Sequence, residues 1–109
     1  MERYSLRGID DFRRMILPLE LREKMKLEKG TKLLLHPIGS IAILEKKDKD
    51  PGINGFLCEV DELGRIEISD EIKSILGWKS KSRLEIYNLD TLIILKCSME
   101  TEKNETDEI

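Results

Sequence analysis

Few side chains in this sequence have the chemistry of a metal ligand or a nucleophile. Cys58 and Cys97 are its only cysteines and form no Cys-x-x-Cys pair, so neither a zinc site nor a disulfide framework is indicated. His36, the single histidine, precedes Pro37 near an expected turn, with no second histidine or clustered nucleophile to form a catalytic or metal site. We therefore predict free thiols, a structural histidine, no cofactor, no metal and no enzymatic activity.

The charged side chains are a stronger signal because they are distributed unevenly. The formal net charge of the 109 residues is −3, yet residues 1–47 contain 11 Lys or Arg against 7 Asp or Glu. Residues 56–97 contain 6 against 8, and residues 98–109 contain 1 against 5. The net negative charge therefore hides a basic first half, and it does not exclude a nucleic-acid partner.

The sequence also repeats itself at a spacing of 51 residues. This shift needs no gap, and it aligns Asp10 with Asp61, Arg14 with Arg65, Glu20 with Glu71, Leu33 with Leu84 and Leu35 with Ile86. An internal repeat predicts two equivalent structural units. Each unit, at roughly 45 residues, is at or below the size that usually folds alone, so we expect the two units to share one core.

Local signals have the same order in both halves. Each half is expected to form two strands, a short helix and two more strands. In the second half the helix follows Ser69 as N-cap and ends at Gly77, and the predicted segments are strand 56–60, turn 61–64, strand 65–68, a strand around 84–88 and strand 91–96. In the first half Pro18 is expected at the first helical position, and the other segments are strand 4–9, turn 10–13, strand 14–17, strand 32–36, turn 37–39 and strand 40–45.

These patterns divide the chain into four segments. Residues 48–55 contain Pro51, Gly52 and Gly55 and are expected to form a linker. We predict a first repeat at residues 1–47, a second repeat at 56–97 and an acidic, disordered tail at 98–109. No apolar run approaches the roughly 18 residues needed to cross a bilayer, and residues 1–6 lack the apolar stretch of a signal peptide, which predicts a cytoplasmic protein.

Residues 60–96, VDELGRIEISDEIKSILGWKSKSRLEIYNLDTLIILK, closely resemble the DNA-binding domain of the AbrB/SpoVT/MazE family. The family pattern has a V-D-x-x-G-R strand and turn, a short helix that ends in L-G, and a final I-I-L-K strand. Residues 9–46 match it more distantly. The resemblance implies a mainly β fold with short helices, the swapped-hairpin AbrB-like β-barrel, in which two ββαββ units interlace. Family members usually form this barrel as homodimers, so two repeats in one chain are similar to a fused dimer.

The resemblance implies a transcriptional regulator that binds double-stranded DNA. Such a protein needs a cationic surface, because phosphate neutralisation supplies much of the affinity and arginine side chains also bind base edges. Arg14 and Arg65 match the family arginine after the turn, and Arg22 and Lys73 match its basic helix position. Arg7 matches a basic position in the first strand, and Arg13 replaces the turn glycine. The predicted DNA-binding residues are Arg7, Arg13, Arg14, Arg22, Arg65 and Lys73.

The second half departs from the family pattern at several basic positions. Cys58 and Glu59 stand where AbrB-like members are basic, and Ser74 replaces a helix arginine. The sequence therefore predicts that most DNA contacts come from the first half. It also predicts that an Arg14→Ala variant loses more affinity than an Arg65→Ala variant.

Other interpretations of these residues remain open at this stage. Asp10 and Asp61 are expected to accept hydrogen bonds within their turns rather than to form a carboxylate dyad. Arg14 and Arg65 could be surface arginines that pair with Glu20, Glu71 or the turn aspartates. Arg22 and Lys73 could only solvate a helix face, and Trp78 is expected to pack in the core. The alternative function is an antitoxin-type or other interaction module whose acidic tail binds a toxin or another protein. A homodimer is a further alternative.

Overall fold

The computed structural model describes residues 1–47, 55–79 and 82–98, which form eight strands and two short helices. The elements of the first half are β1 (Glu2–Gly8), β2 (Arg14–Ile16), α1 (Leu19–Met25), β3 (Lys32–Ile38) and β4 (Ile41–Lys46). Those of the second half are β5 (Phe56–Glu59), β6 (Arg65–Glu67), α2 (Asp70–Leu76), β7 (Arg83–Leu89) and β8 (Leu92–Cys97). The predicted order of elements is thus present in both halves.

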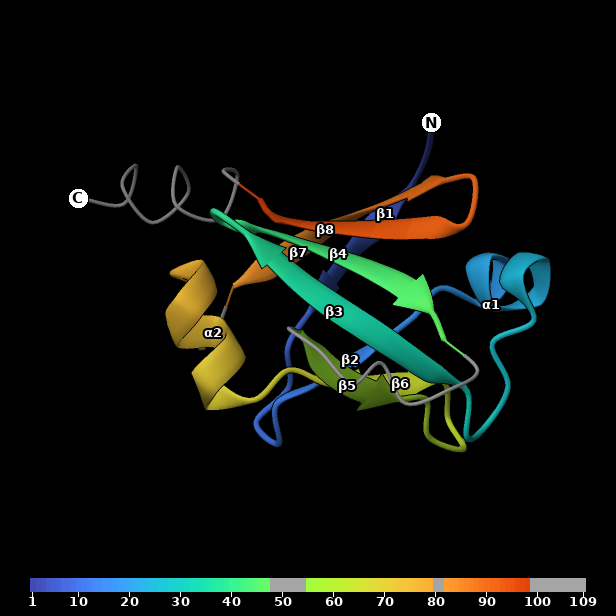
Figure 1. Ribbon diagram of the computed structural model, residues 1–109, viewed down its shortest axis with the longest axis horizontal. Coiled ribbons are helices and arrows are strands. Elements are labelled where there is room, and N and C mark those ends of the chain that lie inside the picture. The colour runs from blue at the N-terminus through green and yellow to red at the C-terminus, as the bar shows by residue number, and fades with distance from the viewer. Residues whose placement is uncertain (48–54, 80–81, 99–109) are drawn as a thin grey trace.

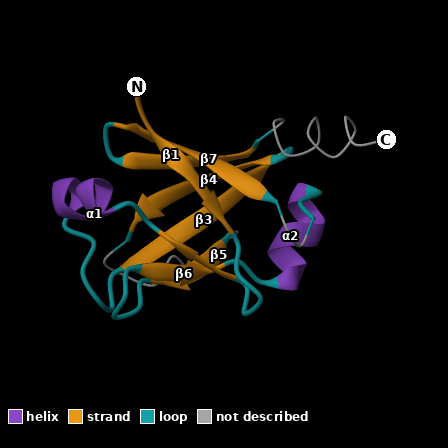
Figure 2. Ribbon diagram, turned by 180° about the vertical axis from the view of Figure 1, so that it is seen from behind, coloured by secondary structure: helices purple, strands orange, loops and turns teal. Residues whose placement is uncertain are grey.

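The strands of the two halves interlace within the single chain. One sheet has the order β1-β7-β8-β4-β3-β5, and β2 pairs with β6 in a second sheet. The hairpins β3–β4 and β7–β8 form within their own halves, whereas β1–β7, β3–β5, β4–β8 and β2–β6 pair between halves, all antiparallel. Figures 1 and 2 show β2 and β6 on one side of the larger sheet, with α1 and α2 at opposite ends. The fold is the expected mainly β, barrel-like arrangement with swapped hairpins.

Both halves contribute to one hydrophobic core. Leu35 of β3, Ile86 of β7 and Met15 of β2 are fully buried. Ile66 of β6 is also buried, with 1% of its surface exposed. These residues point inward because side chains alternate between the two faces of a strand. Trp78 is also buried, as predicted, and its indole N–H donates a hydrogen bond to the carbonyl of Ser40 (2.9 Å).

The helix ends follow the local signals with one difference. Ser69 accepts a hydrogen bond from the backbone N–H of Ile72 (3.2 Å), and Gly77 ends α2 with φ of 74°, as expected of these caps. Pro18 lies at the N-cap position of α1 rather than at the first helical position, because its ψ of 140° is extended. Lys26 ends α1 in the left-handed conformation.

The predicted turn at residues 37–39 is shorter in the structure, and the strand predicted around residues 84–88 is longer. β3 continues through Pro37 to Ile38, so the turn consists of Gly39 and Ser40, and β7 continues to Leu89. Pro37 is compatible with a strand here because β5 pairs only with Lys32 to Leu35, so Pro37 has β4 alone as a neighbouring strand. His36 consequently lies in a strand and bonds the Glu45 carboxylate through Nε2 (2.9 Å).

Both cysteines are free thiols, and burial raises the pKa of Cys58 to about 11. No helix among the described residues has the length and apolarity to span a membrane. Except for Gly55 and Ser98, the predicted linker and acidic tail lie outside the described residues.

Candidate nucleic-acid interface

The turn before β2 fixes the first candidate arginine. The Asp10 side chain accepts hydrogen bonds through Oδ1 from the backbone N–H groups of Phe12 (2.9 Å) and Arg14 (2.8 Å). Its Oδ2 accepts a third bond from Arg14 Nε at 3.1 Å. The backbone bond from Arg14 is the largest of several that hold the pKa of Asp10 below its usual value, so this carboxylate is anionic at neutral pH.

The turn before β6 has the same geometry. Asp61 accepts bonds from the backbone N–H groups of Leu63 (2.9 Å) and Arg65 (2.8 Å), and from Arg65 Nε at 2.7 Å. Partial burial by itself raises the pKa of Asp61, but these hydrogen bonds together outweigh it and lower the pKa below the usual value. Both aspartates are therefore turn acceptors, as predicted, and each one also pairs with the arginine that follows it.

β2 and β6 bring the two arginines onto one surface. In the antiparallel register Arg14 lies opposite Glu67, and Arg65 lies opposite Ile16. Because the pair between them, Met15 and Ile66, is buried, these four side chains share the outward face. Arg14 and Arg65 are thus diagonal neighbours on a surface that we call the β2–β6 face, consisting of Arg14, Ile16, Arg65 and Glu67.

Arg13 lies beside this face in a left-handed conformation, with φ of 64°. Its guanidinium is within 3.7 Å of the Glu67 carboxylate and 3.8 Å of the Asp70 carboxylate, and its side chain is 46% exposed. Two second-half acids therefore offset the charge of this first-half arginine. Such exposed pairs contribute little to stability, but they lower the local positive potential.

Lys73 differs from the expectation of a solvated helix cation. Its side chain is only 10% exposed, and its ammonium group lies 3.3 Å from the Asp70 carboxylate. Arg7 is also separate from the β2–β6 face, because it belongs to β1, which pairs with β7. Arg7 donates hydrogen bonds to the Ser5 hydroxyl (2.6 Å) and to the Leu6 carbonyl (3.1 Å).

Arg22 of α1 packs against the turn of the other half. Its Nε donates a hydrogen bond to the Leu17 carbonyl (2.9 Å), and a side-chain carbon added at Gly64 would overlap its guanidinium. Gly64 also has φ of +80°, which favours glycine. The backbone supports this contact, because Leu17 N–H donates to the Gly64 carbonyl at 2.9 Å. Arg22 therefore lies next to the turn that leads to Arg65, although it belongs to the first half.

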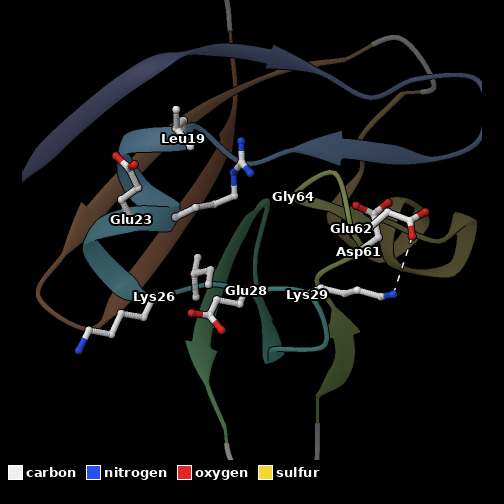
Figure 3. A pocket seen from close by; sticks show the side chains of 10 residues that line it. Leu19, Glu23, Lys26, Glu28, Lys29, Asp61, Glu62 and Gly64 are labelled. Carbon is white, nitrogen blue, oxygen red and sulfur yellow. Dashed lines mark ion pairs between the residues drawn. The ribbon is translucent and has the colours of Figure 1, made fainter.

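A surface pocket of about 420 Å³ adjoins this contact. Figure 3 shows Glu23 of α1 and Lys26, the C-cap of this helix, on one side and Asp61 and Glu62 on the other. The ammonium group of Lys29 lies 3.9 Å from the Glu62 carboxylate, and a dashed line marks this ion pair in Figure 3. The lining contains both charge signs, so it lacks the excess of one charge that would select an anion. Among the described residues, no group of three His, Cys, Asp or Glu side chains could hold a metal ion.

We expect the Gly64→Ala substitution to lower the free energy of unfolding by about 1–2 kcal/mol relative to the wild type. The loss combines the cost of a left-handed alanine with displacement of Arg22 from its hydrogen bond. A double-mutant cycle with Arg22→Ala, measured by urea unfolding, should show that Gly64→Ala costs less once Arg22 is absent.

Gly30→Ala is the matched control, because Gly30 has φ of +89° but no atoms near the added carbon. It should show the conformational cost without coupling to Arg22. Additive losses for Gly64→Ala and Arg22→Ala would contradict the packing argument.

Sequence reasoning missed Phe12 and Leu63, which lie at equivalent places in the two turns. Phe12 is 70% exposed and Leu63 is 57% exposed. The signal was present, since a shift of 51 residues aligns these two apolar residues inside segments predicted to be turns. Glu67 and Asp70 were also missed as partners of Arg13, because their proximity depends on pairing between the halves.

Comparison with known proteins identifies a sequence relative for part of the chain. No family model matches the chain. The transition state regulatory protein AbrB of Bacillus subtilis (strain 168) is 50% identical over 42 residues, which cover 38% of this chain and 44% of AbrB. The matched region thus spans less than half the length of that relative.

A solved structure, the solution structure of PHS018 from Pyrococcus horikoshii, aligns over 86% of both chains with 18% identity and a TM-score of 0.47. The sequence relative is more informative, because half of the matched residues are identical. Over 42 of its residues, the chain is similar to a bacterial transition state regulator.

Proposed function

We propose that this protein is a transcriptional regulator that binds double-stranded DNA through the β2–β6 face and its two adjoining turns. The observation that supports this best is the position of Arg14 and Arg65, which come from different halves and share one outward surface. Guanidinium groups neutralise phosphates and bind base edges with two parallel hydrogen bonds. The similarity to AbrB supports the regulatory role.

The aspartate pairs are compatible with DNA binding. Within the described residues, the side chains of Arg14 and Arg65 donate hydrogen bonds to the aspartates through Nε. This leaves the two terminal nitrogens of each guanidinium for a phosphate or a base. An arginine held in one orientation also loses less conformational entropy on binding.

The six predicted DNA-binding residues differ in how close they lie to the β2–β6 face. Arg14 and Arg65 belong to the face, and Arg13 and Arg22 lie beside its two turns. Arg7 lies in the other sheet, and Lys73 is buried and paired with Asp70, so we assign these two no direct contact with DNA. We propose that residues 1–47 and 56–97 are two repeats forming one binding face for an imperfectly palindromic site, since approximate symmetry in a protein favours approximate symmetry in its site.

A salt titration with duplexes of varied sequence, followed by fluorescence anisotropy, tests this function. The logarithm of the binding constant should fall linearly with the logarithm of salt concentration, with a slope of about −3 to −4 if four arginines neutralise phosphates. Absence of binding at about 50 mM salt would refute the proposal. Single-stranded DNA of the same composition is the control for binding to any polyanion.

A further inference from the structure

The two turns that adjoin the β2–β6 face both present large apolar side chains to solvent. Phe12 and Leu63 lie two residues before Arg14 and Arg65, and they are 70% and 57% exposed. Their backbone N–H groups are each held at 2.9 Å by the turn aspartate, so both turns are fixed in place. Apolar side chains in fixed turns gain nothing from folding when they remain in water.

Phe12 and Arg14 form one unit on this surface. The guanidinium carbon of Arg14 lies 4.9 Å from the centre of the Phe12 ring, a cation–π distance. Ile16, which is 41% exposed, adds a third apolar group to the same surface. The surface therefore alternates guanidinium and apolar groups, whereas contacts to phosphate alone would need only cations and hydrogen-bond donors.

This combination matches the chemistry of a base edge in the major groove. There guanine presents acceptors to arginine, and thymine presents a 5-methyl group to apolar side chains such as phenylalanine. The minor groove has no methyl group, and a two-stranded ribbon such as β2–β6 is of a kind that fits the major groove.

We infer that Phe12 and Leu63 contact thymine 5-methyl groups in the major groove, beside the bases or phosphates bound by Arg14 and Arg65. The inference rests on the proposed function and specifies what the face recognises. Phe12 makes the larger contribution because it is the larger and more exposed of the two side chains. The contacts give the protein a preference for thymine at positions near the two ends of its site.

The test uses a duplex that the wild-type protein has enriched from a random pool, compared with the same duplex containing uracil in place of thymine. Uracil keeps base pairing and phosphates but lacks the methyl group. The wild type should bind the uracil duplex about threefold to tenfold more weakly, as expected for loss of one or two buried methyl contacts. Phe12→Ala should lose a similar factor on the thymine duplex, and it should discriminate less between the two duplexes.

A second measurement distinguishes an apolar contact of Phe12 from an electrostatic contact to phosphate. Phe12→Ala should leave the salt dependence of binding unchanged, because it removes no phosphate contact. Leu89→Ala is the matched control, since Leu89 is exposed at the end of the β7–β8 hairpin, and it should bind like the wild type. Thermal unfolding of Phe12→Ala should match that of the wild type, because the side chain is exposed.

Three results would overturn the inference while leaving DNA binding intact. The first is equal wild-type affinity for the thymine and uracil duplexes, and the second is full thymine discrimination in both Phe12→Ala and Leu63→Ala. The third is enrichment of duplexes without thymine. Absence of any duplex binding would overturn the proposed function as well, so the two failures are distinguishable.

Discussion

Arg14→Ala and Arg65→Ala are each expected to weaken binding to duplex DNA by about tenfold or more, since an arginine that binds a base edge contributes on the order of 1–3 kcal/mol. Each substitution should also reduce the salt slope by about 1 if the arginine neutralises a phosphate. The measurement is the salt titration described above, performed on both variants and on the double variant.

The structure predicts similar losses for the two variants, within about threefold. Charge counting along the sequence predicted a larger loss for Arg14. Interlacing of the halves removes that reason, because Arg22 of the first half packs against Gly64, next to the turn that leads to Arg65. Arg13, also of the first half, faces Glu67 and Asp70, which offset its charge beside Arg14.

Arg3→Ala is the matched control for charge. Arg3 is an exposed arginine of β1 and contacts Tyr87 of β7, away from the β2–β6 face. It should change affinity far less than either face variant. Equal losses for all three variants would show that binding responds only to net charge and would contradict a defined face.

Leu35→Ala and Ile86→Ala are each expected to destabilise the protein by about 2–5 kcal/mol, the usual cost of truncating a large buried side chain. Both side chains are fully buried in the same core cluster, on strands from different halves. Since domains of this size have stabilities of about 5–15 kcal/mol, either loss is a large fraction of the total.

Urea unfolding tests whether the halves fold as one unit. Trp78, the single tryptophan, belongs to the second half and donates a hydrogen bond to Ser40 of the first. Its fluorescence therefore reports on the second half and its contact with the first, while far-UV circular dichroism reports on the whole chain. Leu35→Ala should move both transitions by the same amount, although Leu35 is in the first half. Ile38→Ala is the control, because Ile38 is exposed on the same strand, and it should change stability by less than about 0.5 kcal/mol.

A fluorescence transition that Leu35→Ala leaves unchanged would contradict a shared core. Two separate transitions would contradict it equally. The strand pairing makes independent unfolding difficult, because β7 of the second half lies between β1 of the first half and β8.

Much of the local structure was predictable from the sequence because it depends on neighbours a few residues away. Asp10 and Asp61 accept bonds within their own turns, and Ser69 and Gly77 cap α2 as their residue types predict. The predicted hairpin turn begins at Pro37, but in the structure the turn begins at Gly39. Its position depends on which strands lie beside β3. Sequence signals cannot supply that information.

The sequence by itself determined the order of elements, the turns that orient Arg14 and Arg65, and the alternation that buries Met15 and Ile66. Only the tertiary structure decided which cations meet on one surface. It buried Lys73, separated Arg7 from the β2–β6 face and brought Arg22 against Gly64. The physical reason is that the positions of Arg7 and Arg22 depend on contacts between the two halves, which lie far apart in the sequence. Antiparallel pairing of β1 with β7 and the backbone bond from Leu17 to Gly64 set these contacts.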